Sequence, residues 1–117
     1  MSDEKGYNGW TNYETWLVAL WLDNEQGSYD YWREAALEAY RSPAENRYMD
    51  PDARRRLTLV ERLRTEIKDE GIPDELSSGL YSDLLNAALS EVDWYDLARH
   101  YLDEIQDEAD EADEVEE

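Results

Sequence analysis

Apolar residues recur every three or four positions along most of this chain, and that spacing constrains its fold more than any other feature. The clearest stripe contains Leu80, Tyr81, Leu84, Leu85, Ala88, Leu89 and Val92. Residues three or four apart lie on one face of an α-helix. No run of alternating β-branched residues is present. The pattern therefore predicts an all-α protein, a compact bundle of about five short helices.

Residues that favour helix ends divide the chain into segments. They place helices at about 12–23, 29–41, 51–70, 79–91 and 94–107. Thr11 and Glu14 form a T-x-x-E capping box at the first start, and Ser28 is the expected cap of the second helix. The first helix is expected to turn one apolar stripe towards the core, made of Tyr13, Trp16, Leu17, Leu20 and Trp21.

The later helices have equally distinct boundaries. Asp50-Pro51 combines an N-cap with a proline at the first helical position, and Gly71 suits the left-handed position after a helix end. Asp93 is the expected cap of the last helix, with Asp96 as the reciprocal acid. The length of 117 residues suits one domain. We assign residues 1–107 to a single helical domain and residues 108–117 to an acidic tail, in which repulsion between carboxylates favours disorder.

The net charge of −20 is unevenly distributed. Residues 71–117 contain sixteen acids and a single base, Arg99, and so contribute −15, whereas residues 41–70 contain seven acids and eight bases. Such acidity repels phosphates, which argues against direct nucleic-acid binding and against binding to anionic membranes. The arginines of the basic stretch Arg54–Arg64 are expected to pair with acids on neighbouring helices or to lie on a mixed, solvated face. A basic protein surface is the expected partner.

Several classes of chemistry find no support in the residues. The absence of Cys removes disulfides, thiol nucleophiles and Cys-based metal sites, and agrees with a cytoplasmic protein. His100 is the single His, and no G-x-S-x-G or metal-binding spacing accompanies it. The longest apolar run, Trp16–Leu22, is too short to cross a bilayer. We therefore predict no catalytic residue, no cofactor and no metal, and a protein that is not an enzyme.

Acidic residues near the C-terminus are spaced as rows on a helix. Carboxylates three or four residues apart lie about 5–6 Å apart along a helix axis, and duplex DNA presents a phosphate about every 3.4 Å along each strand. Such rows can imitate a phosphate track and occupy a basic groove. The predicted partner-binding residues are Asp96, Asp103, Glu104, Asp107, Glu108, Asp110 and Glu111. A solubilising tail, a halophilic composition and a flexible lure for any basic partner remain alternatives.

Aromatic residues concentrate near the N-terminus, where Gly9–Trp32 holds four of the five tryptophans. Since Phe is absent, Trp and Tyr must supply the aromatic part of the core. The alternative function is therefore a non-enzymatic adaptor that binds another protein through Tyr7, Trp10, Tyr13 and Tyr31. A homodimer through partly exposed aromatic faces stays open as well.

Two stretches carry a resemblance to known proteins. WTNYETWLVALWLDNEQGSYDYW (Trp10–Trp32) and LSEVDWYDLARHYLDE (Leu89–Glu104) resemble small helical proteins of phages, plasmids and other mobile elements. That group shares a T-N-Y-E-T-W box and a V-[DN]-W-x-x-[IL]-A box. The resemblance implies a mobile-element context and no chemistry.

The C-terminal segment Val92–Glu117 is similar in style to the end of Ocr, the phage DNA mimic that blocks type I restriction enzymes. Each segment contains a Trp-bearing helix and then ends in an acidic run. The likeness implies an anti-defence role. Our leading hypothesis is a DNA mimic of the antirestriction or anti-CRISPR type, which would occupy the DNA-binding groove of a host restriction or CRISPR effector.

Overall fold

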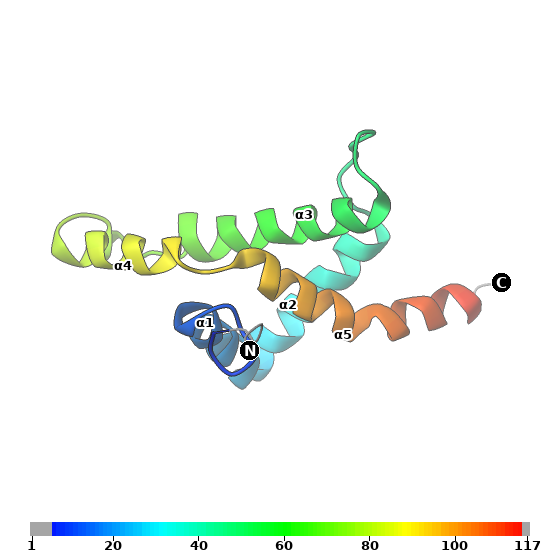
Figure 1. Cartoon of the computed structure of the whole chain (residues 1–117), viewed down its shortest axis with the longest axis horizontal. Helices are drawn as coiled ribbons and strands as arrows, with labels where there is room; N and C mark the ends of the chain where they lie inside the picture. Colours follow the sequence, from blue (N-terminus) through cyan, green and yellow to red (C-terminus); the bar gives the residue numbers. More distant parts are fainter. Residues whose placement is uncertain (1–5, 116–117) are drawn as a thin grey trace.

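The protein is built from helices, as its sequence predicts. The computed structural model describes the backbone of residues 6–115 and the side chains of residues 6–106 and 108. Its elements, drawn in Figure 1, are α1 (Tyr13–Asn24), α2 (Gln26–Arg41), α3 (Pro51–Leu63), the π-helical turn η1 (Arg64–Asp69), the 3-10 turn η2 (Asp74–Leu76), α4 (Leu80–Ser90) and α5 (Trp94–Val115). The all-α prediction is confirmed.

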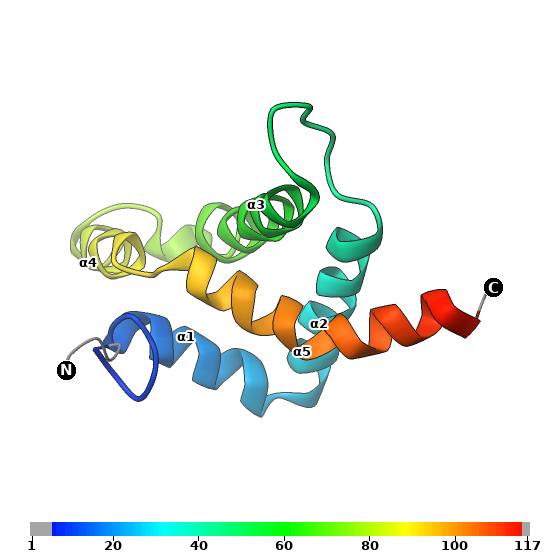
Figure 2. The same ribbon diagram turned by 45° about the vertical axis from the view of Figure 1, so that its right-hand side comes forward.

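Helix α5 is the centre of the bundle. Helices α2 and α3 pack along it, and α1 packs beside α2, as Figure 2 shows. The predicted face of α5 is buried throughout, and it consists of Trp94, Leu97, Ala98, Tyr101, Leu102 and Ile105. Helix α2 meets it with Ala35, Ala36 and Ala39, and α3 with Leu59, Val60 and Leu63. Small side chains on α2 let the two backbones approach closely, so the bulky residues of α5 fill the remaining space.

The predicted inward stripe of α1 is wrong for three of its five residues, while Trp16 and Leu17 are partly buried. Thr15 and Ala19 are the buried residues of this helix, whereas Tyr13, Leu20 and Trp21 are exposed, the last to 66%. Because α1 is apolar on nearly every side, its periodicity does not select a face. The narrow side, with Thr15 and Ala19, faces the bundle, and the large aromatic side chains face outwards.

Two predicted N-caps are also wrong. Asn12 caps α1 instead of Thr11, because its side-chain oxygen accepts the backbone N–H of Thr15. Helix α2 begins at Gln26 after Glu25, earlier than the predicted cap Ser28. The helical conformation is therefore interrupted by a single residue between α1 and α2. By contrast, the predicted cap Asp50 is confirmed, since its carboxylate accepts the N–H of Ala53 at 2.8 Å.

Gly71 does not take the left-handed conformation predicted for it. Among residues 6–115, positive φ angles occur at Asn8, Gly9 and Gly79. A Cβ at Gly71 would lie 2.5 Å from the carbonyl oxygen of Ile67. Glycine is therefore needed here for a close approach to the preceding π-helical turn, since any side chain would collide with it.

The apolar stripe of α4 divides between two environments. Ser82 is buried and Leu89 packs against the core, but Leu80, Tyr81 and Leu84 are exposed to 66%, 64% and 56%. Figure 1 shows α4 projecting at one end of the molecule, with the C-terminal end of α5 at the other. The stripe predicts the helix correctly, but much of it lies outside the core.

Helix α5 continues past residue 107, where the sequence suggests that a tail begins, and ends at Val115. The segment is rich in Ala and Glu, which favour helix. No helix in the described part of the chain has the length and apolarity that a bilayer crossing requires.

Candidate functional site

The N-terminal aromatic residues are positioned by a tight turn. Tyr7 and Trp10 exchange both backbone hydrogen bonds, at 2.9 and 2.7 Å, and the residues between them, Asn8 and Gly9, have φ angles of 48° and 90°. An Asn-Gly pair with two positive φ angles suits a type I′ turn. The turn sends the side chains of Tyr7 and Trp10 to two different parts of the molecule.

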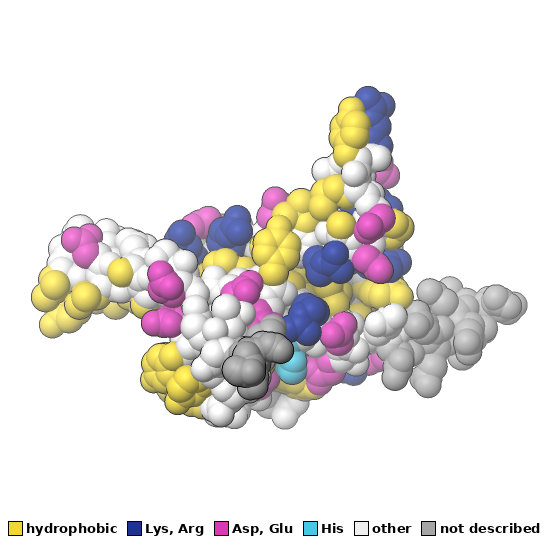
Figure 3. All heavy atoms as spheres, viewed as in Figure 1, with side chains coloured by type: hydrophobic (Ala, Val, Ile, Leu, Met, Phe, Trp, Pro, Cys, Tyr) yellow, Lys and Arg dark blue, Asp and Glu magenta, His cyan; other side chains and the backbone are white. Residues whose placement is uncertain are grey.

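Tyr7 joins an aromatic group at the start of α1. Its ring centroid lies 5.2 Å from that of Tyr13 and 5.0 Å from that of Trp16. Tyr7 and Tyr13 are 37% and 46% exposed. Figure 3 shows hydrophobic side chains gathered over this part of α1. Two of the four predicted aromatic contact residues therefore lie together on an accessible surface.

The other two make contacts within the chain, although Tyr31 remains 45% exposed. Trp10 packs against the core, and its ring lies 5.0 Å from that of His100, centroid to centroid. The hydroxyl of Tyr31 donates to Glu66 at 2.6 Å and accepts from Arg62 at 3.1 Å. These contacts hold α2 to α3, and the hydrogen bond to Tyr31 contributes most to raising the pKa of the Arg62 guanidinium. Arg62 also pairs with Glu38 of α2, as predicted, whereas Arg55 pairs with Asp52 of its own helix.

The segment Thr11–Thr15 is hydrogen-bonded to the start of α5. The Thr11 hydroxyl lies within reach of the carboxylates of Asp93, at 2.8 Å, and Asp96, at 3.0 Å. The Asn12 side-chain amide donates to the carbonyl oxygen of Glu91 at 2.6 Å.

Thr15 is the innermost member of this joint. It is fully buried. Its hydroxyl donates to the side-chain oxygen of Asn12 at 2.6 Å and accepts the backbone N–H of Asp93 at 2.9 Å. The caps of α1 and α5 are thus bonded to each other through one hydroxyl, and the spacing T-N-x-x-T serves this joint.

Asp96 belongs to the same joint. It is 4% exposed, and its carboxylate accepts the backbone N–H of Thr11 and an N–H of Arg99. Asp93 caps α5 as predicted, by accepting the N–H of Asp96 at 3.1 Å. The predicted reciprocal hydrogen bond from the backbone N–H of Asp93 to Asp96 does not form, because this N–H donates to the hydroxyl of Thr15 instead. Asp96 is thus buried inside the protein and is not on a surface that could contact a partner.

The described acids further along α5 are exposed. Asp103 has a 66% exposed side chain and lies 3.9 Å from Arg99. Glu104 accepts a hydrogen bond from Tyr29, which raises the pKa of the Tyr29 hydroxyl, and Glu108 pairs with Arg33. The side chains of Asp107, Asp110 and Glu111 lie outside the described residues.

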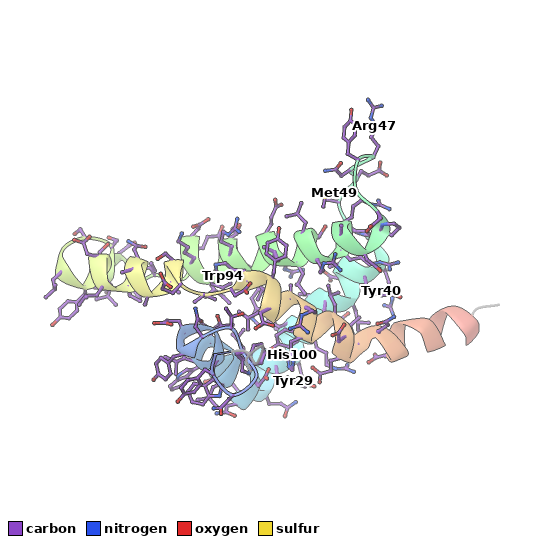
Figure 4. All side chains as sticks on the ribbon, viewed as in Figure 1. Tyr29, Tyr40, Arg47, Met49, Trp94 and His100 are labelled. Carbon is purple, nitrogen blue, oxygen red and sulfur yellow. The ribbon has the colours of Figure 1, made fainter. Side chains whose placement is uncertain are left out.

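Asp23 extends this acidic surface to the end of α1. Its carboxylate accepts the hydroxyl of Tyr101 at 2.6 Å and lies 3.8 Å from the Nε2 atom of His100. Burial, and next the hydrogen bond to Asp23, raise the pKa of the Tyr101 hydroxyl. Figure 4 shows His100 and Tyr29 in the region where α1, α2 and α5 meet.

The His, Asp and Glu side chains of the described residues do not gather into a metal site. No group of three or more His, Cys, Asp or Glu in that part of the chain could hold a metal ion. A shallow hollow between α3 and α5 is lined by Arg55, Arg56 and Arg99. Two of these arginines already pair with carboxylates, Arg55 with Asp52 and Arg99 with Asp96. An anion would have to compete with those contacts.

Sequence reasoning missed the exposed apolar residues. They are Leu20 and Trp21 on α1, and Leu80, Tyr81 and Leu84 on α4. For α1 one signal could have indicated them, because this helix is apolar on nearly every side and one side of a short helix in a small bundle must face outwards.

A protein-family model matches nearly the whole chain. It is described as a family of unknown function, DUF7249, and the match covers residues 3–116. No curated protein and no solved structure shows significant similarity to the sequence.

Proposed function

Since this chain belongs to DUF7249, a family of unknown function, we propose its function from the surface that it presents. We propose a non-enzymatic inhibitor that imitates DNA and occupies the basic DNA-binding groove of a host defence protein. A restriction–modification enzyme or a CRISPR effector would be such a target. The mobile-element and Ocr resemblances of the sequence support this context, and the host cytoplasm would be the site of action.

One observation carries the proposal. Helix α5 continues as a regular helix to Val115, ten residues beyond its last core residue, Ile105. Residues 103–115 contain eight acids and no base. On a helix these acids fall in rows with a rise of about 6 Å between positions four apart. The exposed carboxylates of Glu104 and Asp23 continue the acidic surface onto the bundle.

Electrostatics define the expected binding behaviour. A basic groove would attract the acidic helix over long distances, and salt would screen that attraction. The proposed contact residues are Asp103, Glu104, Asp107, Glu108, Asp110 and Glu111. Asp96 is left out because it is buried and already hydrogen-bonded.

The test compares two sets of neutralised acids in the full chain. The first variant carries Asp107→Asn, Asp110→Asn and Glu111→Gln. The matched control carries Glu45→Gln, Asp69→Asn and Glu70→Gln, which change the same charge on exposed residues away from α5. Binding to a restriction–modification enzyme and to a CRISPR effector complex is measured at increasing salt, with duplex DNA as competitor.

The first variant should bind at least about tenfold more weakly and with a shallower salt dependence, since it lacks three carboxylates that neutralise basic groups. The control should bind as the unmodified chain does. Binding that is independent of salt, or that is equally strong in the first variant and the control, contradicts the proposal.

The exposed aromatic surface supports a second candidate, an adaptor that binds another protein. Tyr13 and Trp21 are 46% and 66% exposed on α1, and such side chains dominate many protein interfaces. Under this reading Trp21→Ala abolishes partner capture with the bundle intact, while the neutralised α5 variant still captures the partner. The reverse pattern favours the DNA mimic.

A further inference from the structure

Helix α4 presents an apolar face that the rest of the chain does not cover. Leu80, Tyr81 and Leu84 are more than half exposed, and Ala87 and Ala88 are exposed beside them. The opposite side of the helix, with Ser82 and Leu89, faces the protein. Figure 3 shows hydrophobic side chains along one side of this projecting helix.

The charge of α4 limits what can cover this face. Asp83 is its single charged residue, in a chain with a net charge of −20. Asp83 is rotated by about 100° from Leu84 around the helix axis, so it lies beside the apolar face. A basic partner would find little charge to match here. Two copies of this chain, which repel one another elsewhere, would meet with the least repulsion at α4.

The order of large and small side chains makes the face complementary to itself. The large residues Leu80 and Tyr81 lie at the start of the helix, Leu84 lies at the middle, and Ala87 and Ala88 lie at the end. When two such helices pack in opposite directions, the large residues of each meet the alanines of the other. Packing in the same direction would set large against large and small against small.

We propose that the chain forms a two-fold symmetric dimer in which α4 packs antiparallel against α4 of a second copy. The symmetry axis passes near Leu84, as expected for an interface in which both copies use the same patch. Small residues at both ends of the contact allow the helix axes to approach to about 8 Å. The dimer also keeps the C-terminal ends of both α5 helices free, because they lie at the far end of each copy from α4 (Figure 1).

The available apolar area suits a reversible dimer. The exposed parts of Leu80, Tyr81 and Leu84 amount to roughly 350 Å² per copy. A standard interface buries about 800 Å² per partner. The α4 face is less than half of that area, so we expect a weak and reversible dimer.

Sedimentation equilibrium of the full chain over a range of concentrations tests the dimer. The expected mass at high concentration is twice the chain mass of 13.8 kDa. Leu84→Glu should weaken the dimer by about 100-fold, because it places two carboxylates at the symmetry axis. Tyr48→Glu is the matched control, since it adds the same charge at a residue that is 83% exposed in the α2–α3 connection, and it should leave the dimer nearly unchanged. Far-UV circular dichroism checks that both variants remain folded.

The orientation is tested by cross-linking, which the absence of Cys in the chain permits. A Leu80→Cys chain mixed with an Ala88→Cys chain should form the mixed disulfide in preference to either symmetric one. A monomer at all concentrations up to the millimolar range overturns the proposal, as does a dimer that Leu84→Glu leaves intact. Symmetric disulfides alone overturn the antiparallel arrangement.

Salt separates this proposal from the proposed function. Added salt should strengthen the dimer, because it screens the repulsion between two acidic chains, whereas it should weaken binding to a basic effector. The two proposals stand on different helices, so the failure of one leaves the other unaffected.

Discussion

Replacing Thr15 by Val should destabilise the protein more than any conservative change at an exposed threonine. Val has nearly the shape of Thr but lacks the hydroxyl, which is fully buried in the joint between α1 and α5. The change leaves the backbone N–H of Asp93 without the acceptor that it has at 2.9 Å, and the side-chain oxygen of Asn12 loses one of its two donors.

The magnitude follows from these two losses. A buried N–H without a partner costs about 1–3 kcal/mol, and the second hydrogen bond contributes about 1 kcal/mol. We expect the free energy of unfolding to fall by about 2–4 kcal/mol. In a domain of this size, 1 kcal/mol corresponds to about 4 °C in Tm, so the midpoint should fall by about 8–16 °C.

Urea titration and thermal melts followed by circular dichroism measure this loss. Thr15→Ser keeps the hydroxyl and loses a methyl group, at a cost of about 1 kcal/mol. Thr65→Val changes an exposed threonine of η1 and should stay within about 0.5 kcal/mol of the unmodified chain. The reasoning is refuted if Thr15→Val is no more destabilising than Thr15→Ser, because the buried hydroxyl would then contribute nothing.

Three further outcomes follow from the same structure. Asp96→Asn should lower the free energy of unfolding by about 2–3 kcal/mol, because this buried carboxylate accepts hydrogen bonds from a charged donor and a backbone donor. Asp103→Asn should change the free energy of unfolding, measured by urea titration, by less than about 0.5 kcal/mol. Equal effects of the two substitutions would contradict the buried, structural role of Asp96. The folded-state pKa of Tyr101 is raised, so the stability that its neutral hydroxyl contributes is complete below its unfolded pKa of about 10 and declines at higher pH. The free energy of unfolding should therefore fall as the pH rises above about 10, and Tyr101→Phe should reduce that fall. An equal fall in the variant would count against the burial of this hydroxyl and its contact with Asp23. Finally, the last turn of α5 carries no base, so the acids at this end of the helix oppose the helix dipole. Acidification from pH 7 to about pH 4 should therefore increase the helical content measured by circular dichroism. A chain shortened to residue 107 should not show this increase.

The sequence predicted those parts of the fold in which one residue type has one clear role. Asp50-Pro51 begins α3 because proline and a capping carboxylate suit no other place so well. The stripe of α5 is buried as predicted because apolar residues occupy one side of the helix and charged residues the other.

The predictions failed where several partners compete for one group. Thr11 could cap its own helix, but its hydroxyl turns to Asp93 and Asp96, which are 82 and 85 residues away in sequence. Asp96 has the same charge as Asp103 in sequence, yet one is buried and the other exposed. No local pattern encodes that difference, because the distant segment Thr11–Thr15 decides it.

By itself the sequence determined that the chain is helical, where most helices begin and end, and that the negative charge gathers towards the C-terminus. Those properties depend on residues within one or two turns of each other. The tertiary structure alone decided which side of α1 and of α4 faces outwards, and which carboxylates are free. A helix that is apolar all round, such as α1, has no preferred inner side until its neighbours are in place. Only the packing of α2 and α5 against Ala19 and Thr15 left Trp21 exposed.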